Sequence, residues 1–239
     1  MENFLLPVET TTITLPESKK QIKIRPIKVR EEQILIMGKE SENPKDFPET
    51  ISQVVNSCII TNNASSATLS MCDFLYTFMK LREISRGTTT TIVLTCLNDE
   101  CKHEETKDFK LEDILNIETK NISNIVKITE NYALQFKIIT YDDYIKVFLT
   151  NNEKPSRILY KIAAEHLLTS VLINEQNIPV TDTNKKDIIE NLTQSAMDII
   201  QEWFENQSVI YTKFEWTCQK CKKENTFIDV DPIRFFVLA

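Results

Sequence analysis

The alternation of hydrophobic and polar residues predicts that the chain begins with a β-hairpin. Residues 11–15 and residues 21–25 both alternate with the period of two that is typical of half-buried strands. Residues 16–19 lie between them, begin with Pro16 and have the composition of a turn. A two-stranded hairpin is therefore the first element that we expect.

Two helices are predicted after the hairpin, because the hydrophobic period changes there to that of a helix. The first covers about residues 29–40, and its inward face is expected to consist of Val29, the stem of Gln33, Ile36 and Met37. The second is expected to bury the stripe Ile51, Val54, Val55, Cys58 and Ile59. Cys58 is then an inert thiol in the core.

A third helix is signalled at both ends. Ser70 and Asp73 have the spacing of a capping box, and Gly87 stands where a glycine C-cap would. Its predicted buried residues are Cys72, Leu75, Phe78, Met79 and Leu81. Its cations are Lys80, Arg82 and Arg86. They form either a patch for an acidic partner or, as we favour, a solvated face that complements the helix dipole.

A β-rich segment is predicted next. Residues 88–95 are largely β-branched and run directly into Cys96. Shorter strands are expected at residues 109–111, 125–128 and 133–139.

The remainder of the chain is predicted to be helical and then to form a second hairpin. Helices are expected to begin at capping residues, namely Thr140, Ser156, Thr183 and Thr193. The short first helix reaches Phe148, and the second is expected to continue to Val171. Residues 209–217 alternate as a strand that leads into Cys218, and residues 225–230 can return from it.

Two cysteine pairs stand at strand ends far apart in the sequence. Cys96 and Cys101 follow the first β-branched strand, and Cys218 and Cys221 follow the strand near the C-terminus. Zinc favours four soft ligands in a tetrahedron, and cysteine pairs two to four residues apart supply them two at a time. The sequence therefore predicts one structural zinc ion that ties the middle of the chain to its C-terminal part.

Basic residues surround both pairs, namely Lys102, Lys220, Lys222 and Lys223. They can offset the net charge of about −2 that four thiolates and a divalent ion would leave. Lys102 and Lys222 occupy the positions in which such knuckles commonly carry glycine. The basic cluster therefore requires no external anion.

Two other interpretations of the cysteines are less consistent with the sequence than zinc. A redox dithiol would share the spacing of Cys218 and Cys221, but such pairs normally stand at a helix start, and here a strand precedes them. His103 could replace one cysteine as a ligand, but with four cysteines at hand we expect an exposed loop histidine.

Composition narrows the possible functions. The 239 residues, 41% of them hydrophobic, can build a sizeable core. The net charge of −7, from 28 basic and 35 acidic residues, offers no attraction for nucleic acid or an anionic membrane. No run of about 18 apolar residues occurs and the start lacks a basic region, so we expect a protein that is neither membrane-spanning nor secreted. Inside a cell, where thiols are kept reduced, the six cysteines indicate metal ligands or free thiols rather than disulfides.

No catalytic constellation is predicted. His166 lies on an apolar helix face with no second histidine or placed carboxylate beside it, so we expect a core or subunit-interface histidine. The only glycines, Gly38 and Gly87, form no phosphate-binding loop, and a four-cysteine zinc site leaves no open coordination position. We therefore expect a protein that is not an enzyme.

These elements predict an α+β fold. It consists of an N-terminal β-hairpin plus a helical bundle, with a β-rich, zinc-ribbon-like part built from residues of about 88–139 and 209–230. The expected segments are residues 1–87, 88–139, 140–206 and 207–239. We expect them to form one or two intertwined domains in which the last segment packs on the second.

Several stretches spread over nearly the whole chain carry a family resemblance. They are residues 23–37 (KIRPIKVREEQILIM), 73–87 (DFLYTFMKLREISRG), 139–143 (ITYDD), 187–204, 216–221 (WTCQKC) and 234–236 (RFF). In this order they resemble the baseplate hub assembly proteins of T-even-type contractile-tailed bacteriophages. The chain departs from that family at residues 205–207, where a proline is usual, and in its lack of knuckle glycines.

The resemblance implies a protein that helps to assemble the central hub beneath the tail tube, in the cytoplasm of the infected host. Its implied partners are other baseplate hub and tail proteins, with neither nucleic acid nor membrane. Residence in the virion baseplate, the particular partner and the oligomeric state are left open. The alternative function is a zinc-ribbon protein that binds nucleic acid or serves as a regulatory adaptor, which the acidic net charge opposes.

The C-terminal end contains an apolar run, Phe235, Phe236, Val237 and Leu238. It is a candidate docking tail for a partner, or it completes the core of the protein itself.

Overall fold

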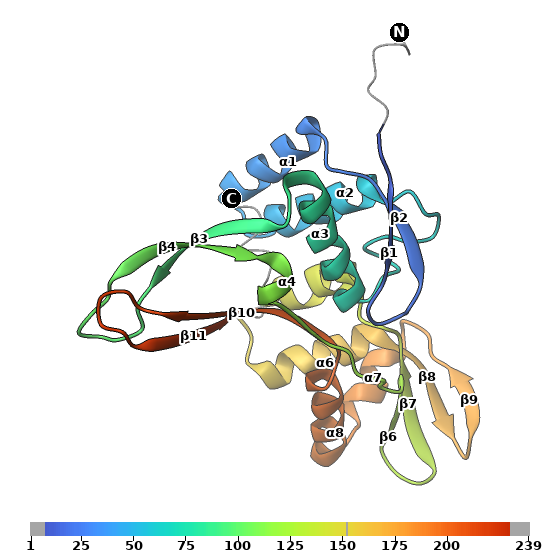
Figure 1. Ribbon diagram of the computed structural model, residues 1–239. Helices are drawn as coiled ribbons and strands as arrows, with labels where there is room; N and C mark the ends of the chain where they lie inside the picture. The colour runs from blue at the N-terminus through green and yellow to red at the C-terminus, as the bar shows by residue number, and fades with distance from the viewer. Residues whose placement is uncertain (1–7, 152, 230–239) are drawn as a thin grey trace.

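The computed structural model describes residues 8–151 and 153–229 of the chain (Figure 1). The apolar run at residues 235–238 lies outside these described residues. The structure has an N-terminal hairpin, helices and several small sheets, which confirms the predicted α+β class. Within the described ranges, no helix is both long enough and apolar enough to cross a membrane. The four-segment division of the chain stays a prediction.

The N-terminal elements pack around one hydrophobic core. They are β1 (Thr11–Thr14), β2 (Gln21–Ile24), α1 (Val29–Glu40), α2 (Asp46–Cys58) and α3 (Met71–Arg86). The two strands pair antiparallel, and α2 buries Ile51, Val54, Val55 and Cys58 as predicted. The Ser70 hydroxyl accepts a hydrogen bond from the Asp73 N–H, and Gly87 has a φ of 94°, so both end signals of α3 are confirmed.

The prediction of which face of α1 points inward is wrong. Its expected members Val29, Ile36 and Met37 are exposed, and the buried positions of the helix are Glu31, Leu35 and Gly38. Gly38 faces Thr50 of α2 so closely that a β-carbon there would collide with the threonine side chain. The close crossing of two helices therefore determines which face of α1 turns inward.

A buried ion pair holds the start of α1 in this orientation. Arg25, just after β2, donates to both carboxylate oxygens of Glu31, with N···O distances of 2.9 and 2.6 Å. The Arg25 guanidinium also donates to the Ser57 carbonyl at the end of α2, at 2.7 Å. The pair thus joins the hairpin to both helices, which is why a charged residue occupies the inward face.

The cations of α3 do not form one solvated face. Arg82 is buried, and its guanidinium donates to the carbonyls of Gly87 and Thr89 beyond the end of the helix. Lys80 pairs with Glu83 within the helix. The interpretation as a solvated face was therefore wrong for Arg82, which satisfies main-chain acceptors instead.

A second hydrophobic core lies under a four-stranded antiparallel sheet. Its strands are β6 (Ile125–Lys127), β7 (Tyr132–Phe136), β8 (Leu168–Ile173) and β9 (Gln176–Pro179), in that order. The helices that pack with it are α6 (Ser156–Leu167), α7 (Lys185–Glu190) and α8 (Gln194–Glu205). Figure 1 shows these elements together below the N-terminal helices.

The long helix predicted from Ser156 is interrupted. It ends at Leu167, and Val171 lies on β8 instead. Asn174 and Glu175 turn the chain back into β9 with positive φ angles of 49° and 66°, the geometry that a tight hairpin requires. Near Thr183 the helix begins later than predicted, with Asn184 as its N-cap, whereas the Thr193 cap of α8 is confirmed.

A short helical segment joins the two cores. It consists of α5 (Tyr141–Asp143), whose predicted cap Thr140 is confirmed, and the π-helix η2 (Tyr144–Leu149). Aromatic rings pack in a row through it, namely Phe74, Tyr141, Tyr144, Phe148 and Phe204, with neighbouring ring centroids 4.1 to 6.4 Å apart. This row connects α3 in the first core to α8 in the second.

The Arg25–Glu31 pair gives a testable prediction. Glu31→Gln should lower the free energy of unfolding by about 3–5 kcal/mol, because it leaves the Arg25 guanidinium buried without its counter-charge. Denaturant unfolding measures the loss. As a control, Glu83→Gln breaks the more exposed Lys80 pair and should change stability by no more than about 1 kcal/mol.

The same pair predicts a pH dependence. The hydrogen bond from Arg25 lowers the pKa of Glu31 to about 2 from its ordinary value of 4.5. A depressed carboxyl pKa stabilises the fold above the unfolded-state pKa, so this contribution, up to about 3 kcal/mol, should disappear as the pH falls from about 5 to 2. An equally steep acid loss in Glu31→Gln would contradict the assignment to this residue.

Candidate metal centre

Two β-hairpins from distant parts of the chain carry the cysteine pairs. The first is β3 (Thr89–Thr95) with β4 (Glu104–Lys110), and the second is β10 (Val209–Thr217) with β11 (Glu224–Asp229). In Figure 1 both hairpins extend together from the helical body, with their turns side by side. Each turn contains one cysteine pair, so the two knuckles meet at the end of this extension.

The sequence predicted only part of this arrangement. Strand β3 and both strands of the C-terminal hairpin are where they were expected. Strand β4 begins at Glu104 rather than at residue 109, and α4 (Leu111–Ile114) and β5 (Leu115–Glu118) were not predicted. Strand β5 pairs with the first half of β10, which fixes the base of the C-terminal hairpin on the N-terminal core.

The structure brings the four predicted ligands together. The sulfur atoms of Cys96, Cys101, Cys218 and Cys221 all lie within 4.8 Å of one another. Cys96 and Cys221 have their sulfurs 3.6 Å apart, and those of Cys101 and Cys218 are 3.9 Å apart. A tetrahedron with metal–sulfur bonds of about 2.3 Å has edges of about 3.8 Å. The donor set therefore fits a tetrahedral thiolate metal site, and the distances are far too long for disulfides.

The main chain of the two knuckles is folded in the same way. The first cysteine of each pair donates its N–H to a carbonyl after the turn, Cys96 to His103 at 2.8 Å and Cys218 to Lys223 at 2.9 Å. The residue after each second cysteine has a positive φ, 43° at Lys102 and 60° at Lys222. These are the places where knuckles commonly carry glycine, so the knuckle conformation is kept here without it.

The thiols influence one another's ionisation. The Lys223 N–H, together with the three other thiols, lowers the pKa of Cys221 to about 6. For Cys101 the His103 N–H acts in the same direction, but burial and the neighbouring sulfurs outweigh it and raise the pKa to about 11. The neighbours of Cys221 thus stabilise its thiolate, whereas the surroundings of Cys101 favour its thiol form. A bound cation would favour the thiolate form of all four.

Asn225 links the two knuckles and was missed from the sequence. Its buried side chain accepts a hydrogen bond from the Leu97 N–H at 2.9 Å and donates to the Lys223 carbonyl at 2.9 Å. The Cys96 sulfur lies 3.7 Å from the same amide oxygen. An asparagine inside a strand is unusual, and that is the signal that could have drawn attention to it.

The candidate ligand His103 does not belong to the cysteine cluster. Its main chain contacts the first knuckle, through its carbonyl to Cys96 and its N–H to the sulfur of Cys101. Among the described residues, the four cysteines form the grouping that could hold a metal ion. Lys102, which was expected to offset the charge of the site, forms an ion pair with Asp99 at 2.7 Å.

His166 does have a carboxylate beside it, contrary to the sequence analysis. Its Nε2 lies 2.7 Å from the buried carboxylate of Asp143, which also accepts from Lys137 at 2.7 Å and from the Thr140 hydroxyl at 2.8 Å. Burial raises the pKa of Asp143, but these donors outweigh it and hold the pKa below its ordinary value. The contact joins α6 to the Thr140 capping box, and the separation of 23 positions in the sequence explains why no local pattern revealed it.

The two cysteines outside the cluster are buried. Burial raises the pKa of Cys58 to about 11 and that of Cys72 to about 12. The thiolate forms of these cysteines are therefore strongly disfavoured.

Comparison with known proteins gives one family. A family model described as T4 bacteriophage base plate protein matches residues 8–237. The search of curated proteins and the search of solved structures gave no match.

The positive φ angles of Lys102 and Lys222 give a prediction about the knuckles. Lys102→Gly and Lys222→Gly should each stabilise the protein by about 0.5–1 kcal/mol, because glycine removes a conformational strain of about 1–2 kcal/mol and adds some entropy cost. Thermal unfolding of the protein measures the change. Lys220→Gly, in the same turn but without a positive φ, is the matched control and should give no gain.

Proposed function

Because the chain belongs to the T4 bacteriophage base plate protein family, we propose that it acts in assembly of the central hub of the baseplate, as an assembly factor or minor hub component. Family membership makes it a phage baseplate protein and suggests the virion baseplate as its location and other tail and baseplate proteins as its partners. The order of the resembling stretches supports the hub assembly subfamily. The infected host cytoplasm is the proposed place of action.

The four-cysteine cluster is the observation that carries the physical part of the proposal. It joins residues 125 positions apart in the sequence. Four thiolates with mutual distances near those of a tetrahedron favour zinc and leave no position open for a substrate. We therefore propose a structural zinc ion and a protein that acts by binding rather than by catalysis.

The strands near the cluster explain why a metal would be needed. Strand β4 buries a single residue, Glu105, and β11 buries a single residue, Asn225. Both are polar, whereas the partner strands β3 and β10 contribute Leu94 and Trp216 to the first core. Each of these two residues lies two positions before the first cysteine of a knuckle, so apolar burial ends near the base of the turns. A metal ion bound by both turns would fix the two hairpins to each other beyond that point.

A fixed pair of hairpins suits an assembly protein. Binding loses less conformational entropy when the contacting surface is already ordered. The proposed zinc therefore acts indirectly, by keeping the hairpin surfaces in one arrangement when a hub or tail protein binds.

Cys218→Ser tests the proposal. The variant should lose its metal, unfold at a lower denaturant concentration and fail to join baseplate proteins, because zinc-binding free energies of about 10–16 kcal/mol are part of folding in such sites. Metal analysis, denaturant unfolding and affinity capture from phage-infected cells measure the three effects. Cys58→Ala, which removes a buried thiol outside the cluster, is the matched control and should keep metal and capture.

Two results would contradict the proposal separately. A Cys218→Ser protein of normal stability would show that the cysteines do not clamp the fold. Capture of the wild-type chain without any hub or tail protein would refute the assembly role, whatever its metal content.

A further inference from the structure

A cleft lies on the side of the molecule where the two cores meet, away from the cysteine cluster. It has an aromatic part of about 240 Å³ and a polar part of about 690 Å³. The two parts share four lining residues, Glu17, Ser70, Ile138 and Gln207. The two parts therefore adjoin, and together they are termed the groove; the loops after β1 and β7 and the end of α8 contribute to both.

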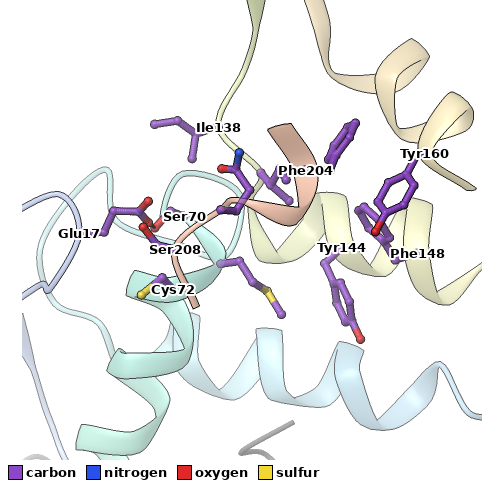
Figure 2. A pocket seen from close by; sticks show the side chains of 12 residues that line it. Glu17, Ser70, Cys72, Ile138, Tyr144, Phe148, Tyr160, Phe204 and Ser208 are labelled. Atoms are coloured by element: carbon purple, nitrogen blue, oxygen red, sulfur yellow. Dashed lines mark hydrogen bonds between the residues drawn. The ribbon is translucent and has the colours of Figure 1, made fainter. Parts of the chain in front are cut away.

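The aromatic part offers a pocket for an apolar side chain. Figure 2 shows Tyr144, Phe148, Tyr160 and Phe204 on one side of it, opposite Glu17, Ser70 and Ser208. Ile138 stands at its edge with 62% of its surface exposed. An apolar group seated here would cover both the pocket wall and this exposed isoleucine.

The polar part of the groove contains more cations than anions, with three lysines against the carboxylates of Glu17 and Asp73. Lys19, Lys20 and Lys120 line it, and none of them has a carboxylate within 4.0 Å among residues 8–151 and 153–229. They stand out in a protein whose net charge is −7.

The two acidic residues of the groove already have partners. Glu17 accepts a hydrogen bond from the Ser70 hydroxyl, and the buried carboxylate of Asp73 accepts the N–H groups of Glu17 and Ser18 at 2.8 and 3.0 Å. Asp73 is only 1% exposed, so the charges that a ligand meets in this part are the three ammonium groups and the partly buried Glu17 carboxylate.

Reaction chemistry does not explain the groove. The one thiol that lines the groove is that of Cys72 on α3. This residue is only 1% exposed and belongs to the first hydrophobic core rather than to the surface. The walls instead combine an apolar pocket with a strip of cations, which is an arrangement for recognition of an extended chain.

We propose that the groove binds an extended segment of another phage baseplate protein that carries an aromatic or large aliphatic side chain beside acidic residues. The apolar side chain enters the aromatic pocket, and the acidic residues lie against Lys19, Lys20 and Lys120. Charge complementarity selects an acidic segment, and the size of the pocket selects a single large side chain. Only the source of the partner rests on the proposed baseplate function.

The test is a selection of short random peptides on the full-length purified protein. The selected peptides should combine an aromatic or large aliphatic residue with neighbouring Asp or Glu. Their affinity should fall about tenfold or more in the groove variant Ile138→Glu, Lys20→Glu, Lys120→Glu, and it should also fall with added salt. All three positions are exposed, so the fold should be kept, and Lys20→Glu, Lys120→Glu alone provides a second variant.

The matched control makes the same kind of change elsewhere. Met37→Glu, Lys39→Glu replaces one exposed apolar residue and one exposed lysine on α1 and should leave peptide binding unchanged. Failure to select acidic peptides, or equal binding by the groove variant, would overturn the proposal. So would a short duplex DNA that binds the wild type but not the groove variant, or self-association that the groove variant abolishes.

The two proposals fail in different ways. If the groove variant still joins baseplate proteins normally, only the groove proposal is refuted. If the wild-type protein selects acidic peptides but captures no baseplate protein, only the hub assembly role is refuted.

Discussion

Four sulfur atoms from two distant turns converge in one cluster, and this convergence couples the middle of the chain to its C-terminal part. The outer strands β4 and β11 each bury one residue, Glu105 and Asn225, whereas β3 and β10 contribute Leu94 and Trp216 to the first core. Both oxygens of the Glu105 carboxylate lack a hydrogen-bond partner in the described structure, and the Lys107 ammonium is 4.0 Å away. The outer strands therefore gain little from the core near the turns. Asn225 and the paired knuckle hydrogen bonds bring the thiols into position, and a tetrahedral ion would hold them there.

The elements away from the cysteine cluster are held together by different interactions. The Arg25–Glu31 pair fixes the hairpin and two helices, and a row of aromatic rings passes through the π-helix into the second core. The groove lies beside this row, and three of the row's rings, Tyr144, Phe148 and Phe204, line its wall. The protein thus has two separate surfaces, the pair of hairpins that carries the cysteine cluster and the groove beside the aromatic row.

Local chemistry explains which features the sequence could predict. Ser70, Thr140 and Thr193 were recognisable because an N-cap involves contacts only three residues apart, and the cysteine pairs because metal ligands need fixed spacings. The orientation of α1 was not recognisable, because the Arg25–Glu31 pair and the close approach of Gly38 to Thr50, rather than the apolar residues of the helix, determine which face is buried. Strand β4 is rich in charge, and β8 continues an apolar helix without an intervening glycine or proline, so neither had a readable signal. Contacts such as Asp143 with His166 arise only in the folded chain.

X-ray absorption spectroscopy of the purified protein can identify the metal and its ligands. We expect one zinc ion per chain with four sulfur ligands at about 2.3 Å, supplied by Cys96, Cys101, Cys218 and Cys221. A folded protein without bound metal would contradict it. So would a zinc ion with a nitrogen ligand in place of one sulfur, or iron in place of zinc.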